Sequence, residues 1–254
     1  MNRLLVLLAS LAVFLTLSGC AHQDRGPTHD HAHPETRLPL FSDNPPGDLP
    51  AGWNPLIIMR TKKLTEYRLV SDRGRTVLHA RAVAASSGLI NHVSIDPLKQ
   101  PWLKWQWKIE KLIKSADNTE RTKEDSPVRI VLGFDGDKES LSFSDQMMFE
   151  TAKLVTGHDV PFATLMYIWE NKAPVGTVIS NSRTGRIKKL VAASGPDGIA
   201  QWRDFTRNVV EDYQKAFGEK PGRLIGIGVM TDTDNTGETV EAWYGDIRML
   251  PEQH

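Results

Sequence analysis

From residue 65 onward, short runs of the chain alternate between apolar and polar side chains, which is the period of half-buried β-strands. The clearest run spans residues 102–109. Its apolar face carries Leu103, Trp105, Trp107 and Ile109, and its other face carries Trp102, Lys104, Gln106 and Lys108. This pattern predicts a core position for Trp105 and Trp107 and an exposed one for Trp102. Further runs predict strands at 65–70, 75–84, 128–134, 165–169, 175–180, 186–193, 224–231 and 240–250.

Turn and cap signals connect these runs. The segment 71–74 ends in Gly74, which accepts the positive φ of a tight turn and predicts a hairpin. One helix is expected from a cap at Ser144 to about Val155, and a second from about Asn208, with Glu211 placed as in a capping box. Many strands and only two short helices predict an antiparallel β-sandwich, and we favour the jelly-roll type.

The first residues have the pattern of an export signal. Arg3 precedes an apolar run from Leu4 to Leu17, which is shorter than the roughly 20 residues of a spanning helix. The run ends in Leu17-Ser18-Gly19-Cys20, which resembles the lipobox of bacterial lipoproteins. The alternative is an ordinary signal peptide that a chance cysteine follows.

The lipoprotein resemblance implies a compartment. It implies cleavage after residue 19 and lipid on Cys20, so that the membrane becomes a partner of the protein through its acyl chains. Ala21 stands where an aspartate retains inner-membrane lipoproteins, so we expect the cell envelope, with the outer membrane favoured over the inner one. Cys20 is the only cysteine, so lipidation leaves no thiol for a disulfide or a metal.

The remaining chain divides into a tether and one domain. Residues 20–50 are rich in proline and histidine and poor in large apolar residues, which predicts a flexible tether. Residues 51–251 are enough for one domain with a sizeable core. The chain has 31 basic and 31 acidic residues and no basic block, so nucleic acid is not expected as a partner.

An ordered set of motifs in this domain resembles a family of exported bacterial proteins catalogued only as a domain of unknown function. The set includes Trp105-Gln106-Trp107, Tyr167-Ile168-Trp169, Gln201-Trp202, the segment 231–236 and Trp243-Tyr244-Gly245-Asp246-Ile247. The resemblance implies a secreted β-sandwich. It supplies no activity, substrate or catalytic residue.

The strongest candidate for chemistry is the acidic loop 232–238. Alternating carboxylate and amide oxygens around a glycine are what calcium requires, so a calcium site is one hypothesis. Its ligands would be Asp232, Asp234, Asn235 and Glu238. The flanking helices of the helix-loop-helix calcium pattern are absent. The other interpretation is a surface turn, in which such side chains bond their own backbone.

A second acidic pair, Glu124 and Asp125, precedes the strand at 128–134, and Asp135 and Asp137 follow that strand. At about 3.3 Å per residue the strand separates these groups by roughly 23 Å. They therefore cannot form one glycosidase pair, which needs about 5–9.5 Å. The pair before the strand, or the pair after it, can contact the 232–238 loop only if the strand order permits it. The other interpretation is that both pairs lie in solvated turns.

The remaining tryptophans divide between core and surface. Trp169 and Trp202 are expected in the core, and Trp243 is a candidate to line a cleft beside the acidic loop. Aromatic faces stack on flat apolar surfaces such as those of sugar rings. Trp102 and Trp243 are therefore candidate ligand contacts, together with Glu124 and Asp125.

No nucleophile elbow, zinc-peptidase motif or nucleotide-binding glycine loop occurs in the sequence. The leading hypothesis is therefore a membrane-anchored, non-catalytic domain that binds a glycan or another envelope component. One alternative is a glycan-cleaving enzyme whose carboxylates come from Glu124, Asp125, Glu170, Asp232 and Asp234. Another is an accessory subunit of an envelope assembly, which requires an exposed apolar patch.

Overall fold

The computed structural model describes residues 37–156 and 159–253, which lie in the second of two compact units, Pro34–His254. The predicted signal segment, Cys20 and the tether up to residue 36 lie outside the described residues. Among the described helices, none combines the length and the apolar character that crossing a membrane requires.

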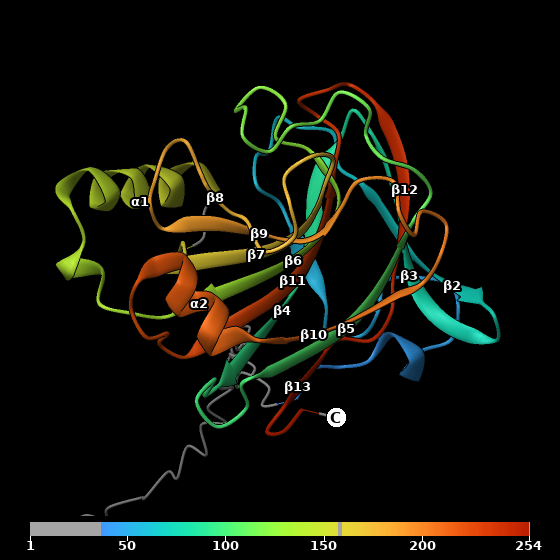
Figure 1. Cartoon of the computed structure of the whole chain (residues 1–254), viewed down its shortest axis with the longest axis horizontal. Coiled ribbons are helices and arrows are strands. Elements are labelled where there is room, and N and C mark those ends of the chain that lie inside the picture. Colours follow the sequence, from blue (N-terminus) through green and yellow to red (C-terminus); the bar gives the residue numbers. More distant parts are fainter. Residues whose placement is uncertain (1–36, 157–158, 254) are drawn as a thin grey trace, which may run out of the picture. The chain divides into compact units, whose positions relative to one another are not determined.

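Two β-sheets form the two layers of the domain (Figure 1). The first sheet has the strand order β1 (Asn54–Leu56), β4 (Ser86–Ile95), β11 (Leu224–Asp232), β6 (Ser126–Phe134), β7 (Ala163–Glu170), β9 (Ile187–Ser194) and β8 (Val178–Ser180). The second has the order β10 (Arg203–Asn208), β5 (Trp102–Ile109), β12 (Thr239–Tyr244), β3 (Arg75–Val83) and β2 (Glu66–Asp72), with β13 (Arg248–Leu250) also paired to β5.

Nearly every pair of neighbouring strands is antiparallel, and the exception is the parallel pair β7–β9. The architecture is mainly β, a sandwich of jelly-roll type with two α-helices, and the predicted fold class is confirmed.

The alternation of residues 102–109 is realised as expected. Trp105 and Trp107 are fully buried, whereas the alternate residues Lys104, Gln106 and Lys108 are only partly buried. Trp105 lies 4.9 Å, between ring centroids, from Tyr167 of the opposite sheet and 5.0 Å from Phe205. The aromatic side chains of the two inner faces thus pack into one core, as a sandwich requires.

The hairpin and the second helix also follow their local signals. Arg73 and Gly74 both have positive φ and join β2 to β3, which is the geometry of a type I′ turn. Helix α2 (Val209–Phe217) begins after Asn208, whose side-chain oxygen accepts from the N–H of Val210 and Glu211.

Helix α1 (Phe143–Thr156) begins earlier than expected. Ser142, rather than Ser144, accepts from the N–H of Asp145, so Ser142 is the capping residue. Figure 1 shows that α1 lies to one side of the sheets, whereas α2 lies against them and contacts β9 and β10. Two 3₁₀ turns, η1 (Phe41–Asp43) and η2 (Lys138–Ser140), complete the elements.

The folded domain includes part of the segment that the sequence analysis assigned to the tether. Leu38, Leu40 and Phe41 are buried, and the Phe41 ring lies 4.9 Å from that of Trp53. Packed residues therefore occur before residue 51, the predicted start of the domain. Leu38, Leu40 and Phe41 are the apolar residues through which this proline-rich segment packs against the core.

Candidate functional site

Three carboxylates from distant parts of the chain meet at one end of the sandwich. Asp125 comes from the loop before β6, Asp232 ends β11, and Asp234 follows it. One carboxylate oxygen of each lies within 4.8 Å of those of the other two. The pairing of β6 with β11 places Ser126 opposite Asp232 and so brings the three together. We call Asp125, Asp232 and Asp234 the acidic cluster.

Arg129 on β6 neutralises Asp232. Its Nε lies 3.0 Å from Oδ1 and its Nη2 lies 2.9 Å from Oδ2 of the carboxylate, and Ser126 N–H also donates to Oδ1. Each of the two side chains is about 5% exposed. A bidentate arginine–carboxylate pair shielded from water is one of the stronger polar contacts available to a protein.

Lysines pair with two further carboxylates at this end. The Nζ atom of Lys189 on β9 lies 2.9 Å from Oε2 of Glu124, and the Nζ atom of Lys62 lies 2.6 Å from Oδ2 of Asp234. Asp125, only 1% exposed, instead accepts hydrogen bonds from the backbone and side chains of Asn235 and Thr236.

Glu170 is a further buried carboxylate at this end of the sandwich. Its Oε2 accepts from the side-chain amide of Asn118 at 2.8 Å, and that amide also donates to the Asp125 carbonyl. Within the described ranges, the Oδ1 atom of Asn118 is buried and has no hydrogen-bond partner. If the Asn118 amide were flipped by 180°, its oxygen would face the Glu170 carboxylate and the Asp125 carbonyl, which are both hydrogen-bond acceptors. The observed orientation is therefore the favourable one.

Burial dominates the electrostatics of this network. It raises the pKa of Asp232 to about 6, with Arg129 opposing the shift and Asp125 adding to it. Burial also lowers the pKa of Lys189, and the nearby charge of Arg129 acts in the same direction. For Arg129, burial acts against the charged form, but the Asp232 carboxylate raises its pKa. The Arg129–Asp232 pair is thus ionised at neutral pH.

The predicted calcium ligands are not all directed at one point. Asp232 and Asp234 belong to the cluster, and the side-chain nitrogen of Asn235 donates to Asp125. Glu238 points elsewhere, because its carboxylate accepts from the backbone of Lys114 and Ser115. The loop 232–238 therefore ties the 114–125 segment to β11. Within this loop, Asp232 is paired with Arg129 and Asp234 with Lys62.

The second group of candidate residues lies on the outer face of the six-stranded sheet. Trp243 on β12 is partly exposed there, between its cross-strand neighbours His79 and Lys108. Its ring centroid lies 5.1 Å from that of His79 and 4.3 Å from the Lys108 Nζ. Tyr244, the next residue, points inward and bonds Thr231. Trp243 therefore faces away from the acidic loop, not into a cleft beside it.

Trp202, for which the sequence predicts a core position, instead lies partly exposed on this outer face. Its indole N–H donates to Asp72 at 2.9 Å, and its ring centroid lies 5.3 Å from the Lys108 Nζ. Asp72 also forms an ion pair with Lys108. Only the sheet pairing brings these residues together, so nothing local to Trp202 signals its position. We call Asp72, His79, Lys108, Trp202 and Trp243 the aromatic patch.

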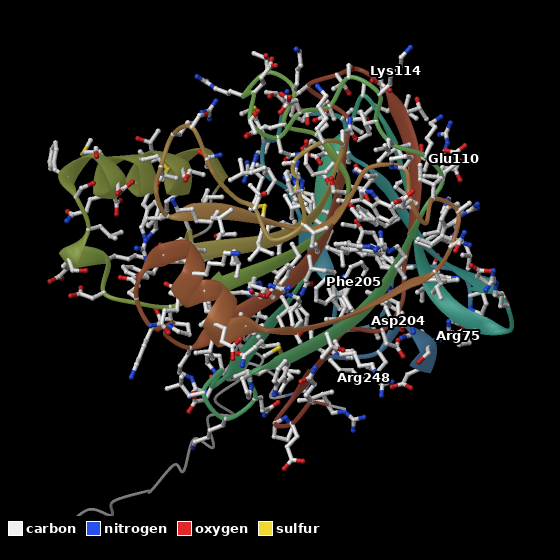
Figure 2. The ribbon with its side chains drawn as sticks, in the orientation of Figure 1. Arg75, Glu110, Lys114, Asp204, Phe205 and Arg248 are labelled. Carbon is white, nitrogen blue, oxygen red and sulfur yellow. The ribbon has the colours of Figure 1, made fainter. Side chains whose placement is uncertain are left out.

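A hollow of about 260 Å³ opens beside this patch. Its lining consists of Arg75, Lys104, Trp105, Gln106, Asp246, Arg248 and Leu250. A Cβ atom placed on Gly245 would lie 3.1 Å from Gln106 and 3.7 Å from the Trp202 ring, so the hollow and the patch adjoin at Gly245. Figure 2 shows Arg75, Asp204 and Arg248 around this part of the sheet. A second hollow, of about 390 Å³, shares Arg248 and Leu250 with the first.

Trp102 also points outward but lies at the other end of β5. It pairs with Asn208 and Leu250, whereas Lys108 pairs with Trp243. Lys108 follows Trp102 by six positions, which corresponds to roughly 20 Å of strand. The structure therefore does not join Trp102 and Trp243 into one surface.

Residues 51–248 match the family model described as "Protein of unknown function (DUF3047)". No curated protein matches the chain.

Similar solved structures include endoglucanase 3 of Trichoderma harzianum, from family GH12, at 7% identity and TM-score 0.41, covering 85% of this chain and 95% of that one. The K2 cleaved adhesin domain of Lys-gingipain is 11% identical at TM-score 0.37, covering 83% and 95%. The cellulose-induced protein Cip1 is 11% identical at TM-score 0.32, covering 80% and 92%. Likenesses this distant carry no argument about function.

Proposed function

The chain belongs to the DUF3047 family of proteins of unknown function, and we propose that it is a non-catalytic, glycan-binding domain of the bacterial cell envelope. The observation that carries this proposal is the aromatic patch with its adjoining hollow. Two partly exposed tryptophans stand beside an open cavity that polar side chains line. Such a combination of aromatic surface and a few oriented polar groups is typical of small-ligand sites.

The contacts of the acidic cluster favour a binding function over glycan cleavage. A glycosidase needs one carboxylic acid and one carboxylate that reach the scissile bond. Asp125 and Asp232 are buried, Asp234 is partly buried, and the three carboxylates are bonded to the 235–236 backbone, Arg129 and Lys62. Their contacts stabilise the loops, which is a structural role.

The proposed location rests on the sequence of the first 21 residues. An acylated Cys20 would hold the domain at a membrane surface, with the outer membrane favoured because Ala21 replaces the inner-membrane aspartate. Radiolabelled palmitate should enter the chain, and Cys20→Ala should abolish the labelling. A labelled Cys20→Ala variant would contradict the anchor.

A glycan array probed with the full chain tests the binding function. The best ligand is then titrated calorimetrically against Trp202→Ala and Trp243→Ala, each of which should weaken binding by about tenfold or more. Phe143→Ala is the control, because Phe143 is an exposed aromatic side chain on α1, outside both the patch and the hollow. Equal losses in all three variants, or no ligand on the array, would refute the proposal. Unchanged circular dichroism must accompany each loss.

Helix α1 favours a second candidate, the accessory subunit of an envelope assembly. Phe143, Met147 and Leu154 are 79%, 51% and 86% exposed on this helix. A photo-crosslinker placed at Leu154 should then trap one defined envelope protein in cells, and Phe143→Ser should remove that product. The same crosslinker at Lys114, outside the helix, is the control. Identical products at both positions would remove this candidate.

A further inference from the structure

The hollow beside the aromatic patch is positively charged. Its lining contains three cationic side chains, Arg75, Lys104 and Arg248, and one carboxylate, Asp246, so its formal net charge is +2. The chain as a whole has a net charge of zero. The excess of positive charge is therefore local to the lining of the hollow, while Asp72 and Asp204 lie on the same face outside that lining.

The carboxylate of Asp246 already has hydrogen-bond partners within the protein. It accepts from the backbone and hydroxyl of Ser42 at 3.0 and 2.7 Å and from Arg248 at 3.2 Å. Within residues 37–156 and 159–253, the side chains of Arg75 and Lys104 have neither a hydrogen-bond nor an ion-pair partner. These two cations are thus available to a ligand.

The strand pairing forces two of the cations together. Arg248 on β13 lies directly opposite Lys104 on β5, and both side chains line the hollow. Like charges directly opposite each other destabilise a sheet. Asp246 offsets part of this repulsion through its pair with Arg248, and an anion bound beside Lys104 would offset the rest. An arginine fork binds carboxylates and other oxyanions with two parallel hydrogen bonds.

The tryptophan side of the site adjoins the cationic side. Trp202 bonds Asp72, which pairs across the hairpin with Arg75, and Gln106 lies beside Trp202 at Gly245. A ligand that occupies both parts needs a ring surface and a negative charge within a few ångströms of each other.

We propose that the ligand is an acidic saccharide, whose sugar ring contacts Trp202 and whose carboxylate or sulfate lies between Arg75, Lys104 and Arg248. This inference rests on the proposed glycan-binding function and names its ligand class. Carboxylated and sulfated sugars share the chemistry that the three cations recognise, and the test below distinguishes them.

The test uses saccharides that differ only in charge. The full chain is titrated with oligogalacturonate and its methyl ester, and with a sulfated and an unsulfated isomalto-oligosaccharide. At least one acidic member should bind about tenfold or more tightly than its neutral partner. The preference should shrink with added salt, because exposed charges are screened. The pair that shows the preference identifies the anion.

Variants then assign the preference to the hollow. The double variant Arg75→Gln/Lys104→Gln should lose the preference for the acidic member while its affinity for the neutral member changes less than about twofold. Arg81→Gln is the matched control, because Arg81 lies on the same sheet outside the hollow and is paired with Glu66 and Glu241.

Each outcome decides between the two proposals. Equal binding of acidic and neutral members would overturn the acidic ligand class and leave glycan binding intact. Absence of binding to every saccharide would overturn both. Free sulfate that binds as tightly as the sulfated saccharide would show a simple anion site and overturn the saccharide class.

Discussion

Arg129 and Asp232 form a bidentate ion pair inside the domain, where each side chain is about 5% exposed. The pair connects neighbouring strands, since Arg129 lies on β6 and Asp232 ends β11. It also anchors the loop 232–238, which in turn holds Asp125. Removal of one partner leaves the other charge buried and uncompensated, so this end of the sandwich depends on both residues.

Arg129→Met should therefore lower the free energy of unfolding by about 3–5 kcal/mol, the cost of an unpaired buried charge. Urea denaturation at pH 7 measures it. Lys123→Met is the control, because Lys123 and Glu120 form an ion pair with side chains about half exposed. That variant should change stability by less than about 1 kcal/mol. Equal losses in the two variants would contradict the assigned role of Arg129.

The pKa of Asp232 gives this residue a defined pH dependence. Its pKa of about 6 in the folded state lies above the ordinary value of 3.8 for an aspartate. Between these values the folded state holds the proton more tightly than the unfolded state. The contribution of Asp232 to stability therefore falls as pH rises from about 4 to about 6, in total by about 3 kcal/mol.

Denaturation of the native chain and of Asp232→Asn at several pH values isolates this term, because other groups titrate alike in both proteins. The stability of the native chain relative to the variant should decline through that window and then level off above about pH 6. A relative stability that instead rises with pH would show that Arg129, not burial, controls the pKa of the carboxyl group.

Calcium should have little effect on the fold. Arg129 and Lys62 already neutralise Asp232 and Asp234, and Glu238 is bonded to the 114–115 backbone. Millimolar calcium should therefore shift the midpoint of thermal unfolding by no more than about 1 °C. A real calcium site, at a calcium concentration of one hundred times its Kd, would add about 2.7 kcal/mol to the free energy of unfolding and shift the midpoint clearly. A larger rise that Asp232→Ala abolishes would establish a calcium site.

Gly88 marks a place where two strands approach too closely for a side chain. A Cβ atom at this position would lie 2.3 Å from the backbone oxygen of Val229 on β11. Gly88→Ala should thus force β4 away from β11 and lower the free energy of unfolding by about 2 kcal/mol or more.

The matched control for that substitution is Gly185→Ala. A Cβ atom there meets open space, and the φ of Gly185 lies outside the left-handed region. Its effect on stability, measured by the same urea titration, should stay within about 0.5 kcal/mol. A Gly88→Ala protein as stable as this control would show that the two strands can separate without cost.

Several strands were not evident in the sequence, for reasons that particular residues make clear. Seven of the ten residues in β4 are buried, but the buried positions include Ser86, Ser87 and Asn91, and these polar residues hide the alternation that marks a half-buried strand. β10 contains one aromatic among charged and polar residues, and it exists because Arg203–Asn208 pairs with β5. The predicted strand at 240–250 is two strands, β12 and β13, which Gly245–Ile247 separates.

The sequence by itself determined the features that depend on neighbouring residues. The side-chain period of 102–109 buried Trp105 and Trp107, and Gly74 and Asn208 set the hairpin turn and the helix cap. Only the tertiary structure decided which distant residues meet. Strand order brought Asp125 to Asp232, placed Trp202 on Asp72 and set Lys104 opposite Arg248. The physical reason is that backbone geometry and side-chain period act over a few residues, whereas sheet pairing joins segments that no local pattern relates.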